Sequence, residues 1–212
     1  MTGNITVNEN NSIRIATDQG VIYVDPFNLK EKAHDAAFIL ITHDHYDHFS
    51  PEDIRKAAGD DTVMVAPEKM AAKAEQVLDA VSRIETVSPG ESREIGGLKL
   101  ETVPAYNQMK PFHPKSAGWV GYIIISGGKR IYIAGDTDAT KEAMGVKCDI
   151  ALVPIGGTFT MNAVKAAELI NTIMPGTAIP VHYGSVAGKP SDGEVFRENV
   201  KEPVEVEFKI RF

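Results

Sequence analysis

The sequence predicts an α/β fold in which helices cover mixed β-sheets. Three observations favour this class: strand-like segments occur at both ends of the chain, strands and helices alternate in its middle, and residues 37–41 are continuously apolar. Alternation of strands and helices is typical of parallel pairing. A strand covered on both faces needs apolar residues throughout, as residues 37–41 provide.

The chain opens with three short strand-like segments, at residues 5–8, 12–16 and 21–24. Asn10-Asn11 and Gln19-Gly20 are turn signals between them, so we expect an antiparallel meander. The apolar run at 37–41 then predicts a buried strand. Open α/β sheets commonly place functional sites at the carboxyl ends of such strands.

A helix is predicted soon after this strand. Ser50 is a suitable N-cap and Pro51 a suitable first helical residue, and the helix is expected to end near Gly59. Residues 62–66 predict the next strand, and a second helix is expected after Pro67. This order predicts parallel pairing in the middle of the chain.

Beyond Pro89-Gly90 the pattern returns to strands, at residues 98–103, 120–126, 130–134, 150–153 and 177–181. Gly127-Gly128 predicts a hairpin between the second and third of these. Residues 161–174 predict a helix, because their apolar positions have core-facing spacing. The alternating apolar residues from Val204 to Ile210 predict a closing strand near the C-terminus.

Composition favours one domain that acts on a small molecule. The chain has 212 residues, of which 43% are hydrophobic and 24% charged, enough for one substantial core. Its formal net charge of -7 disfavours binding to long nucleic acids. The first residues do not resemble a signal peptide, and no apolar stretch approaches the roughly 18 residues of a membrane span. We therefore expect a cytoplasmic protein without membrane association.

The strongest functional signal is the string His-Asp-His-Tyr-Asp-His at residues 43–48, which holds three of the six histidines. Imidazole and carboxylate groups are ligands of zinc, manganese and iron. His43 and His45 can turn toward one centre, whereas Asp47 and His48 need not converge on the same point. Two ligand sets suit a pair of ions about 3.5 to 4 Å apart, as in many hydrolases. The alternative is a polar turn whose histidines only form hydrogen bonds.

This H-x-H-x-D-H string, preceded by Thr42 and a strand, resembles the signature of the metallo-β-lactamase-fold hydrolase superfamily. The resemblance extends over nearly the whole chain and is greatest to compact members related to L-ascorbate-6-phosphate lactonase. It implies a four-layer αββα sandwich of two mixed β-sheets with helices on the outer faces, which accommodates the predicted element order. It also implies a hydrolase that uses two divalent metal ions, with zinc expected first and manganese or iron as alternatives.

The resemblance carries over to two later strand ends. Asp136 follows the strand at 130–134 and matches the superfamily's later carboxylate motif, which implies a ligand bridging both ions. His182 follows the strand at 177–181 and matches the last metal histidine. The alternatives are a plain turn aspartate and a histidine with no metal role.

One ligand of the first centre remains open between two residues. His113 fits the order of the superfamily, whereas Asn107 occupies an alternative position. We favour His113, because an amide oxygen is a weaker ligand than imidazole for such metals. In the resulting scheme the first ion is held by His43, His45 and His113, the second by Asp47, His48 and His182, and Asp136 joins them.

Other residues are expected around this centre. Asp25 matches an early strand-end aspartate of the superfamily, which implies that it holds the ligand loop by hydrogen bonds; a simple turn cap is the alternative. Four loop residues are candidates to receive a substrate carboxylate or phosphate, or else are solvated: Lys115, Ser116, Ser185 and Lys189. Asn107 is a further candidate for contact with the substrate.

The expected reaction is hydrolysis by metal-bound hydroxide, because coordination lowers the pKa of water toward about 7. Asp47 is expected to orient this nucleophile or accept its proton. The expected substrate is a small metabolite, such as an anionic lactone or other ester. The alternatives are a phosphodiesterase, an iron-dependent oxidoreductase and a non-catalytic metal-binding protein. Lactonase-like relatives often assemble, and residues 118–125 offer an aromatic surface for a homo-oligomer.

Overall fold

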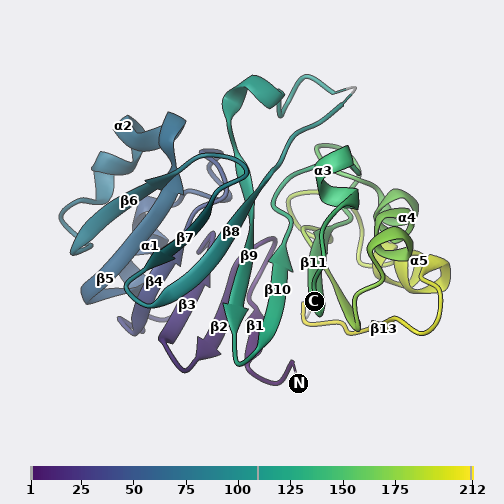
Figure 1. Ribbon diagram of the computed structural model, residues 1–212, viewed down its shortest axis with the longest axis horizontal. Coiled ribbons are helices and arrows are strands. Elements are labelled where there is room, and N and C mark those ends of the chain that lie inside the picture. The colour runs from purple at the N-terminus through teal and green to yellow at the C-terminus, as the bar shows by residue number, and fades with distance from the viewer. Residues whose placement is uncertain (1, 109, 211) are drawn as a thin grey trace.

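The strands lie in two sheets in the computed structural model, which describes residues 2–108, 110–210 and 212 (Figure 1). The first sheet has six strands in chain order: β1 (Ile5–Val7), β2 (Ile13–Thr17), β3 (Gly20–Val24), β4 (Ala36–Leu40), β5 (Ala58–Pro67) and β6 (Arg83–Val87). The first three strands pair antiparallel, and β3 to β6 pair parallel. The predicted opening meander and parallel middle are confirmed.

The second sheet has seven strands: β7 (Ser92–Ile95), β8 (Leu98–Pro104), β9 (Val120–Ser126), β10 (Lys129–Ile133), β11 (Ile150–Pro154), β12 (Thr177–Val181) and β13 (Glu205–Val206). Their spatial order is β13-β12-β11-β10-β9-β8-β7. The strands from β7 to β10 pair antiparallel, which includes the predicted hairpin, and those from β10 to β13 pair parallel. Both sheets are therefore mixed, as expected.

The closing strand is shorter than predicted. Only Glu205 and Val206 pair with β12, after which the chain leaves the sheet and Phe208 lies partly in solvent. The edge strands β6 and β7 were not predicted, because their residues are mostly polar and half-exposed. Central strands are predicted from their apolar pattern, and this pattern is weak in edge strands.

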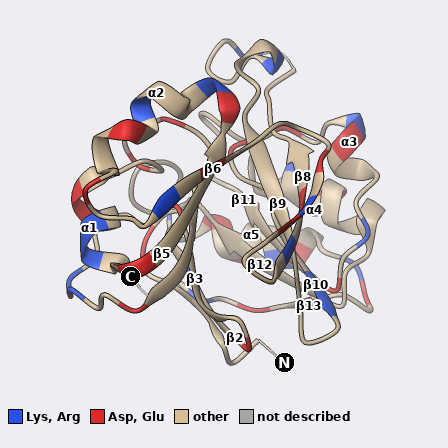
Figure 2. Cartoon of the chain, turned by 60° about the vertical axis from the view of Figure 1, so that its left-hand side comes forward, with Lys and Arg blue, Asp and Glu red and all other residues tan. Residues whose placement is uncertain are grey.

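Helices cover the outer faces of both sheets: α1 (Pro51–Ala57), α2 (Ala71–Ala74), α3 (Lys141–Met144), α4 (Ala163–Ile173) and α5 (Asp192–Asn199). α1 and α2 pack on the first sheet, whereas α3 and α4 contact the second sheet and α5 packs on α4 (Figure 1). Figure 2 shows basic and acidic residues interspersed along α1, namely Glu52, Asp53, Arg55 and Lys56. This arrangement is the expected four-layer αββα sandwich.

Two helix predictions are confirmed in place but not in every detail. Ser50 caps α1 by accepting a hydrogen bond from the Asp53 amide, and α1 ends at Ala57, before Gly59, because β5 begins at Ala58. α4 begins after Asn162, whose side chain accepts a hydrogen bond from the Lys165 amide. No helix within the described ranges is both long and apolar enough to cross a lipid bilayer.

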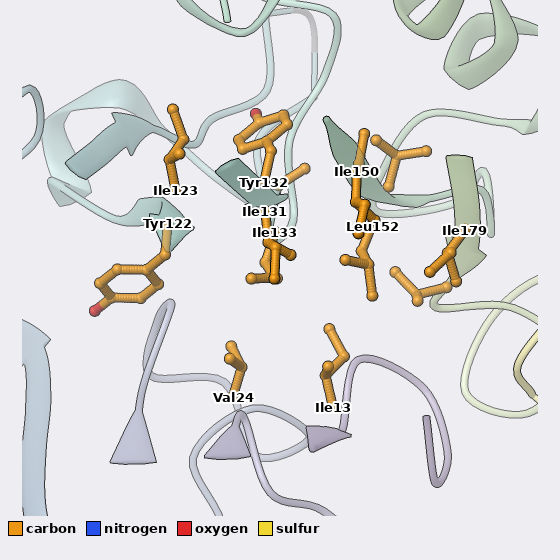
Figure 3. Close-up of a cluster of buried hydrophobic side chains, with 14 of the residues drawn as sticks. Ile13, Val24, Tyr122, Ile123, Ile131, Tyr132, Ile133, Ile150, Leu152 and Ile179 are labelled. Carbon is orange, nitrogen blue, oxygen red and sulfur yellow. The ribbon is translucent and has the colours of Figure 1, made fainter. Parts of the chain in front are cut away.

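The core between the sheets fixes their relative position (Figure 3). Ile13 and Val24 of the first sheet point toward the second sheet, where Ile133 and Leu152 are buried. Burying each such side chain contributes about 1.5–3 kcal/mol. Tyr122 adds a polar link, because its hydroxyl donates to the Ile41 carbonyl oxygen at 2.7 Å. The two sheets are thereby held with the loops after β3, β4, β10 and β12 close together.

Candidate metal centre

The first ligand set predicted from the sequence is brought together by loops of both sheets. His43 and His45 follow β4, and His113 lies in the long loop between β8 and β9. One nitrogen atom from each of the three rings lies within 4.8 Å of the others. Trp119 packs against all three rings, at 5.0, 4.9 and 5.3 Å between ring centroids.

The second predicted set is also assembled from both sheets. Asp47 and His48 belong to the loop after β4, and His182 follows β12. Ligand atoms of these three residues likewise lie within 4.8 Å of one another. The Asp47 Oδ2 atom is 3.4 Å from Nε2 of both His48 and His182. Each set therefore joins the two sheets.

Asp136 lies between the two sets. Its Oδ2 atom is 3.3 Å from Nε2 of His113, in the first set, and 3.3 Å from Nε2 of His182, in the second. Its Oδ1 atom is 3.4 Å from Nε2 of His48. A single carboxylate thus contacts both sets, which is the geometry required of a bridging ligand.

Several ring nitrogens of these side chains lack hydrogen-bond partners, as expected of metal ligands. Nε2 of each of the four buried histidines has no hydrogen-bond partner among the described residues: His43, His48, His113 and His182. An unpartnered buried polar atom costs about 1–3 kcal/mol. Because four such atoms converge beside two carboxylates, bound cations are the simplest source of the missing partners.

Asp25 orients two of these histidines. Its carboxylate accepts hydrogen bonds from the Thr42 amide at 2.8 Å and the Thr42 hydroxyl at 2.6 Å. Its Oδ2 atom is 2.7 Å from Nδ1 of His48, and Thr42 Oγ1 is 2.9 Å from Nδ1 of His43. Engaging Nδ1 leaves Nε2 of each ring directed to the centre, as metal-binding histidines require.

Asn107 supports His113 and does not replace it. The Asn107 side-chain oxygen lies 3.0 Å from Nδ1 of His113, and the Asn107 amide donates to the His113 carbonyl oxygen. The ring therefore presents Nε2 to Asp136. The two residues that the sequence offers as alternatives occupy one arrangement, with the imidazole inside and the amide behind it.

Asn10 is a supporting residue that the sequence analysis missed. Its side-chain nitrogen donates to Asp47 Oδ2 at 2.8 Å. Its backbone carbonyl oxygen accepts from the backbone N–H of His182 at 2.9 Å. Asn10 is fully buried in the turn between β1 and β2. An asparagine in a turn is already explained by local geometry. Only its contacts across the fold reveal the second role.

Backbone conformation at the site is restrictive. His182 and Asp25 have φ of 56° and 46°, in the left-handed region, which costs about 1–2 kcal/mol per residue. Gly135 has φ of 63°, and a Cβ there would lie 3.2 Å from both Thr42 Cβ and the Val120 carbonyl oxygen. The glycine therefore allows the Asp136 loop to approach the loop after β4 closely.

Buried charges shift the pKa values of the cluster. Burial opposes the charged form of His48, but the carboxylates of Asp136 and Asp25 outweigh it and raise the His48 pKa well above its usual value. By the same balance of burial and Asp136, the pKa of His182 rises to about 9. Burial, followed by repulsion from His48, lowers the pKa of His43. The second set is therefore partly cationic when it holds no ion.

These shifts predict proton release when the centre is loaded. At pH 7 the imidazoles of His48 and His182 are protonated in the metal-free protein, because their pKa values are raised above neutrality. Ions bind only neutral imidazole, so we expect zinc binding at pH 7 to release about two protons and zinc affinity to increase from pH 7 to about pH 9. Calorimetry in buffers of different ionisation enthalpy measures the release. An affinity that is constant between pH 7 and 9 would contradict the prediction.

A pocket of about 370 Å³ opens beside the cluster. Its lining includes the cluster residues His45, Asp47 and Asp136 and the side chains of Tyr46, Phe112, Phe159 and Val186. The four loop residues predicted to bind substrate are outside this lining. Lys115 instead pairs with Glu142 at 2.7 Å, and the Ser116 carbonyl oxygen accepts from Lys69. Ser185 and Lys189 are exposed in the loop after β12.

Residues 118–125 do not form the predicted aromatic surface. Tyr122 is fully buried between the sheets, and Trp119 packs on the histidines. Tyr122 points inward because β9 is buried from Val120 to Ile124.

Comparison with known proteins identifies the family. Residues 14–183 match the Beta-lactamase superfamily domain. A UPF0173 metal-dependent hydrolase of Thermoplasma acidophilum is 34% identical over 187 residues, covering 85% of this chain and 78% of that protein. Another, from Aeropyrum pernix, is 32% identical over 191 residues, covering 81% and 76%. The crystal structure of a Parabacteroides distasonis protein assigned as a metal-dependent hydrolase is 29% identical, covers 98% and 93% of the two chains and has a TM-score of 0.80. The chain therefore belongs to the beta-lactamase superfamily and is a metal-dependent hydrolase with the metallo-β-lactamase fold.

Proposed function

We propose that the chain hydrolyses a lactone or other carboxylic ester of a small molecule with two divalent ions bound at the cluster. The observation that carries this proposal is the pair of ligand sets contacted by one carboxylate, Asp136, beside a pocket. His43, His45 and His113 would hold one ion, and Asp47, His48 and His182 the other. We expect zinc first, with manganese or iron as alternatives, since the donors are imidazole and carboxylate groups.

Two ions held in this way would supply an activated water at neutral pH and polarise the bond under attack. The reaction requires that the oxygen of water bond to the acyl carbon, that the acyl carbon–oxygen bond break, and that the leaving alcohol gain a proton. The products are a carboxylic acid and an alcohol, or a hydroxy acid from a lactone.

Asp47 is the residue of the cluster best placed to orient water. It lines the pocket, and Asn10 fixes one of its oxygens by a 2.8 Å hydrogen bond. Burial favours its neutral form, but the imidazole rings of His182 and His48, each with Nε2 3.4 Å from Asp47 Oδ2, outweigh burial and hold the pKa of Asp47 well below the usual range. Asp47 therefore remains ionised at neutral pH and accepts hydrogen bonds. A carboxylate with a depressed pKa is better suited to orienting a water molecule than to removing its proton.

The proposal is tested by metal analysis of protein purified without added metal, joined to a hydrolysis panel on the same sample. The panel contains lactones, carboxylic esters and phosphodiesters. We expect two equivalents of divalent ion, turnover of lactones or esters, and loss of that turnover on chelation with recovery on adding zinc or manganese. A His45→Ala variant should lose turnover.

The sixth histidine provides the matched control. His34 lies outside the cluster, where its Nδ1 atom is 2.8 Å from the Ala58 carbonyl oxygen, so His34→Ala should keep both ions and turnover. Oxygen consumption by an iron-loaded sample that hydrolyses nothing in the panel would replace this proposal with redox chemistry. Full turnover in His45→Ala would remove the assigned role of the cluster.

A further inference from the structure

The side of the pocket away from the metal cluster is apolar. Phe112 comes from the loop between β8 and β9, Phe159 from the loop between β11 and α4, and Val186 from the loop between β12 and α5. Tyr46 adds a fourth side chain from the loop after β4. We call these four side chains the apolar wall. Three of them come from the second-sheet half of the molecule and one from the first.

Two of the three rings of the apolar wall, those of Tyr46 and Phe112, are exposed although they are large, and the ring of Phe159 is half-buried. Tyr46 is 69% exposed and Phe112 is 44% exposed, values that leave a large part of each ring available to a ligand. Phe112 and Phe159 form an edge-to-face pair with centroids 4.9 Å apart, and Tyr46 contacts Phe27 at 6.0 Å. These contacts hold the rings in place. Exposed aromatic rings grouped beside a polar centre are typical of a small-molecule site.

The same pocket has no cationic wall. Within the part of the chain that the structure describes, its lining contains neither lysine nor arginine. The nearby Lys110 is engaged by Asp138 at 3.0 Å and by the Thr160 carbonyl oxygen, and Lys115 is engaged by Glu142. A phosphate or carboxylate on the distal part of a substrate would therefore meet no basic partner.

We propose that the substrate is a neutral ester or lactone that carries an aryl or branched alkyl group, which packs on the apolar wall while its carbonyl group faces the metal cluster. This inference rests on the proposed function and replaces the anionic metabolite expected from the sequence. A volume of about 370 Å³ lies at the lower end of the range for small-molecule sites, so the apolar group is about one ring in size. Phe112 is the specificity-determining residue, because it is exposed and also contacts Phe159.

Two lactones that differ in one substituent test the proposal. γ-Phenyl-γ-butyrolactone and γ-carboxy-γ-butyrolactone share the same ring and scissile bond, and only the first is neutral and aromatic. We expect kcat/KM of the metal-loaded enzyme to be at least about 10-fold higher for the phenyl compound. Phe112→Ala should lower kcat/KM for the phenyl compound about 10-fold, chiefly through KM, and leave that for the carboxy compound unchanged. Ten-fold corresponds to about 1.4 kcal/mol, the scale of one lost aromatic contact.

Phe208→Ala is the matched control, since Phe208 is 38% exposed and lies outside the pocket. Phe208→Ala should leave kcat/KM for both lactones unchanged. Equal or better cleavage of the carboxy compound, or an unchanged ratio in Phe112→Ala, would overturn the proposal.

Binding is measured separately from turnover. Benzylacetone is a neutral aryl ketone that hydrolysis cannot cleave, and we expect its affinity for the metal-loaded protein to fall about 10-fold in Phe112→Ala and to be unchanged in Phe208→Ala. If no ester or lactone is cleaved, the proposed function fails, and this titration still decides whether the apolar wall binds an aryl group. Equal affinity in wild type and Phe112→Ala would overturn the wall's role.

Discussion

An Asp136→Ala variant is expected to keep its fold and lose activity by roughly 10³-fold. Asp136 contacts both ligand sets, so its removal leaves each set with one donor fewer and removes a carboxylate that lies 3.3 Å from both His113 and His182. A metal pair supplies several kcal/mol of transition-state stabilisation, and about 4 kcal/mol corresponds to the stated factor. The measurements are kcat/KM on the best ester or lactone and metal content after dialysis, which should fall below two equivalents.

A surface aspartate supplies the control for this variant. Asp79 is exposed and pairs with Arg55 at 2.7 Å, and neither residue belongs to the metal cluster. Asp79→Ala should therefore keep full metal content and activity. Circular dichroism should show the same secondary structure in both variants. Wild-type turnover with two bound ions in Asp136→Ala would contradict the bridging position assigned to Asp136.

Asp25→Ala is expected to destabilise the metal-free protein by about 3–5 kcal/mol. Asp25 is fully buried, and its carboxylate contacts the Thr42 amide and hydroxyl, the Asn11 side chain and His48. Removing it strands several buried donors, one of them on a histidine with a raised pKa. Its left-handed φ of 46° also suits alanine less well than aspartate. Urea unfolding in the presence of chelator measures this loss without a metal contribution.

The conservative variant separates shape from charge. Asp25→Asn keeps one acceptor oxygen and tolerates the left-handed backbone, so its loss of stability should be clearly smaller. Both variants should bind zinc about 10–100-fold more weakly, because His48 and Thr42 lose their anchor. Unchanged unfolding free energy in Asp25→Ala would show that the Asp25 hydrogen bonds do not hold the loop.

The site residues that directly follow strands could be predicted from the sequence. The residues whose role depends on contacts with distant parts of the chain could not. His43, Asp136 and His182 were found because each lies in a motif at the end of a strand, and a strand end is readable from local pattern. The choice between His113 and Asn107 stayed open because their loop has no such pattern. The structure shows that they contact each other, with 3.0 Å between the Asn107 oxygen and His113 Nδ1.

The substrate pocket was the part least accessible to sequence. Lysines and serines in loops near the cluster are reasonable anion ligands, but the partner of a lysine depends on tertiary structure, as Glu142 is for Lys115. In the chain, Phe112 and Phe159 are separated by the three strands β9, β10 and β11 and by α3, and they meet only when the second sheet is formed. The element order was recovered except for short or polar elements at the edges, such as β7 and α5, where an apolar pattern is weak.

Each ligand set contains residues from both sheets, so bound ions would affect the stability and lifetime of the folded protein as well as its chemistry. Ions bound there would act as clamps across the sandwich, so that separating the sheets requires releasing them. Binding to the native state alone stabilises it by RT ln(1 + [M]/Kd), where [M] is the free ion concentration and Kd its dissociation constant. Metal starvation is therefore expected to make this protein more susceptible to proteolysis, in addition to removing its activity.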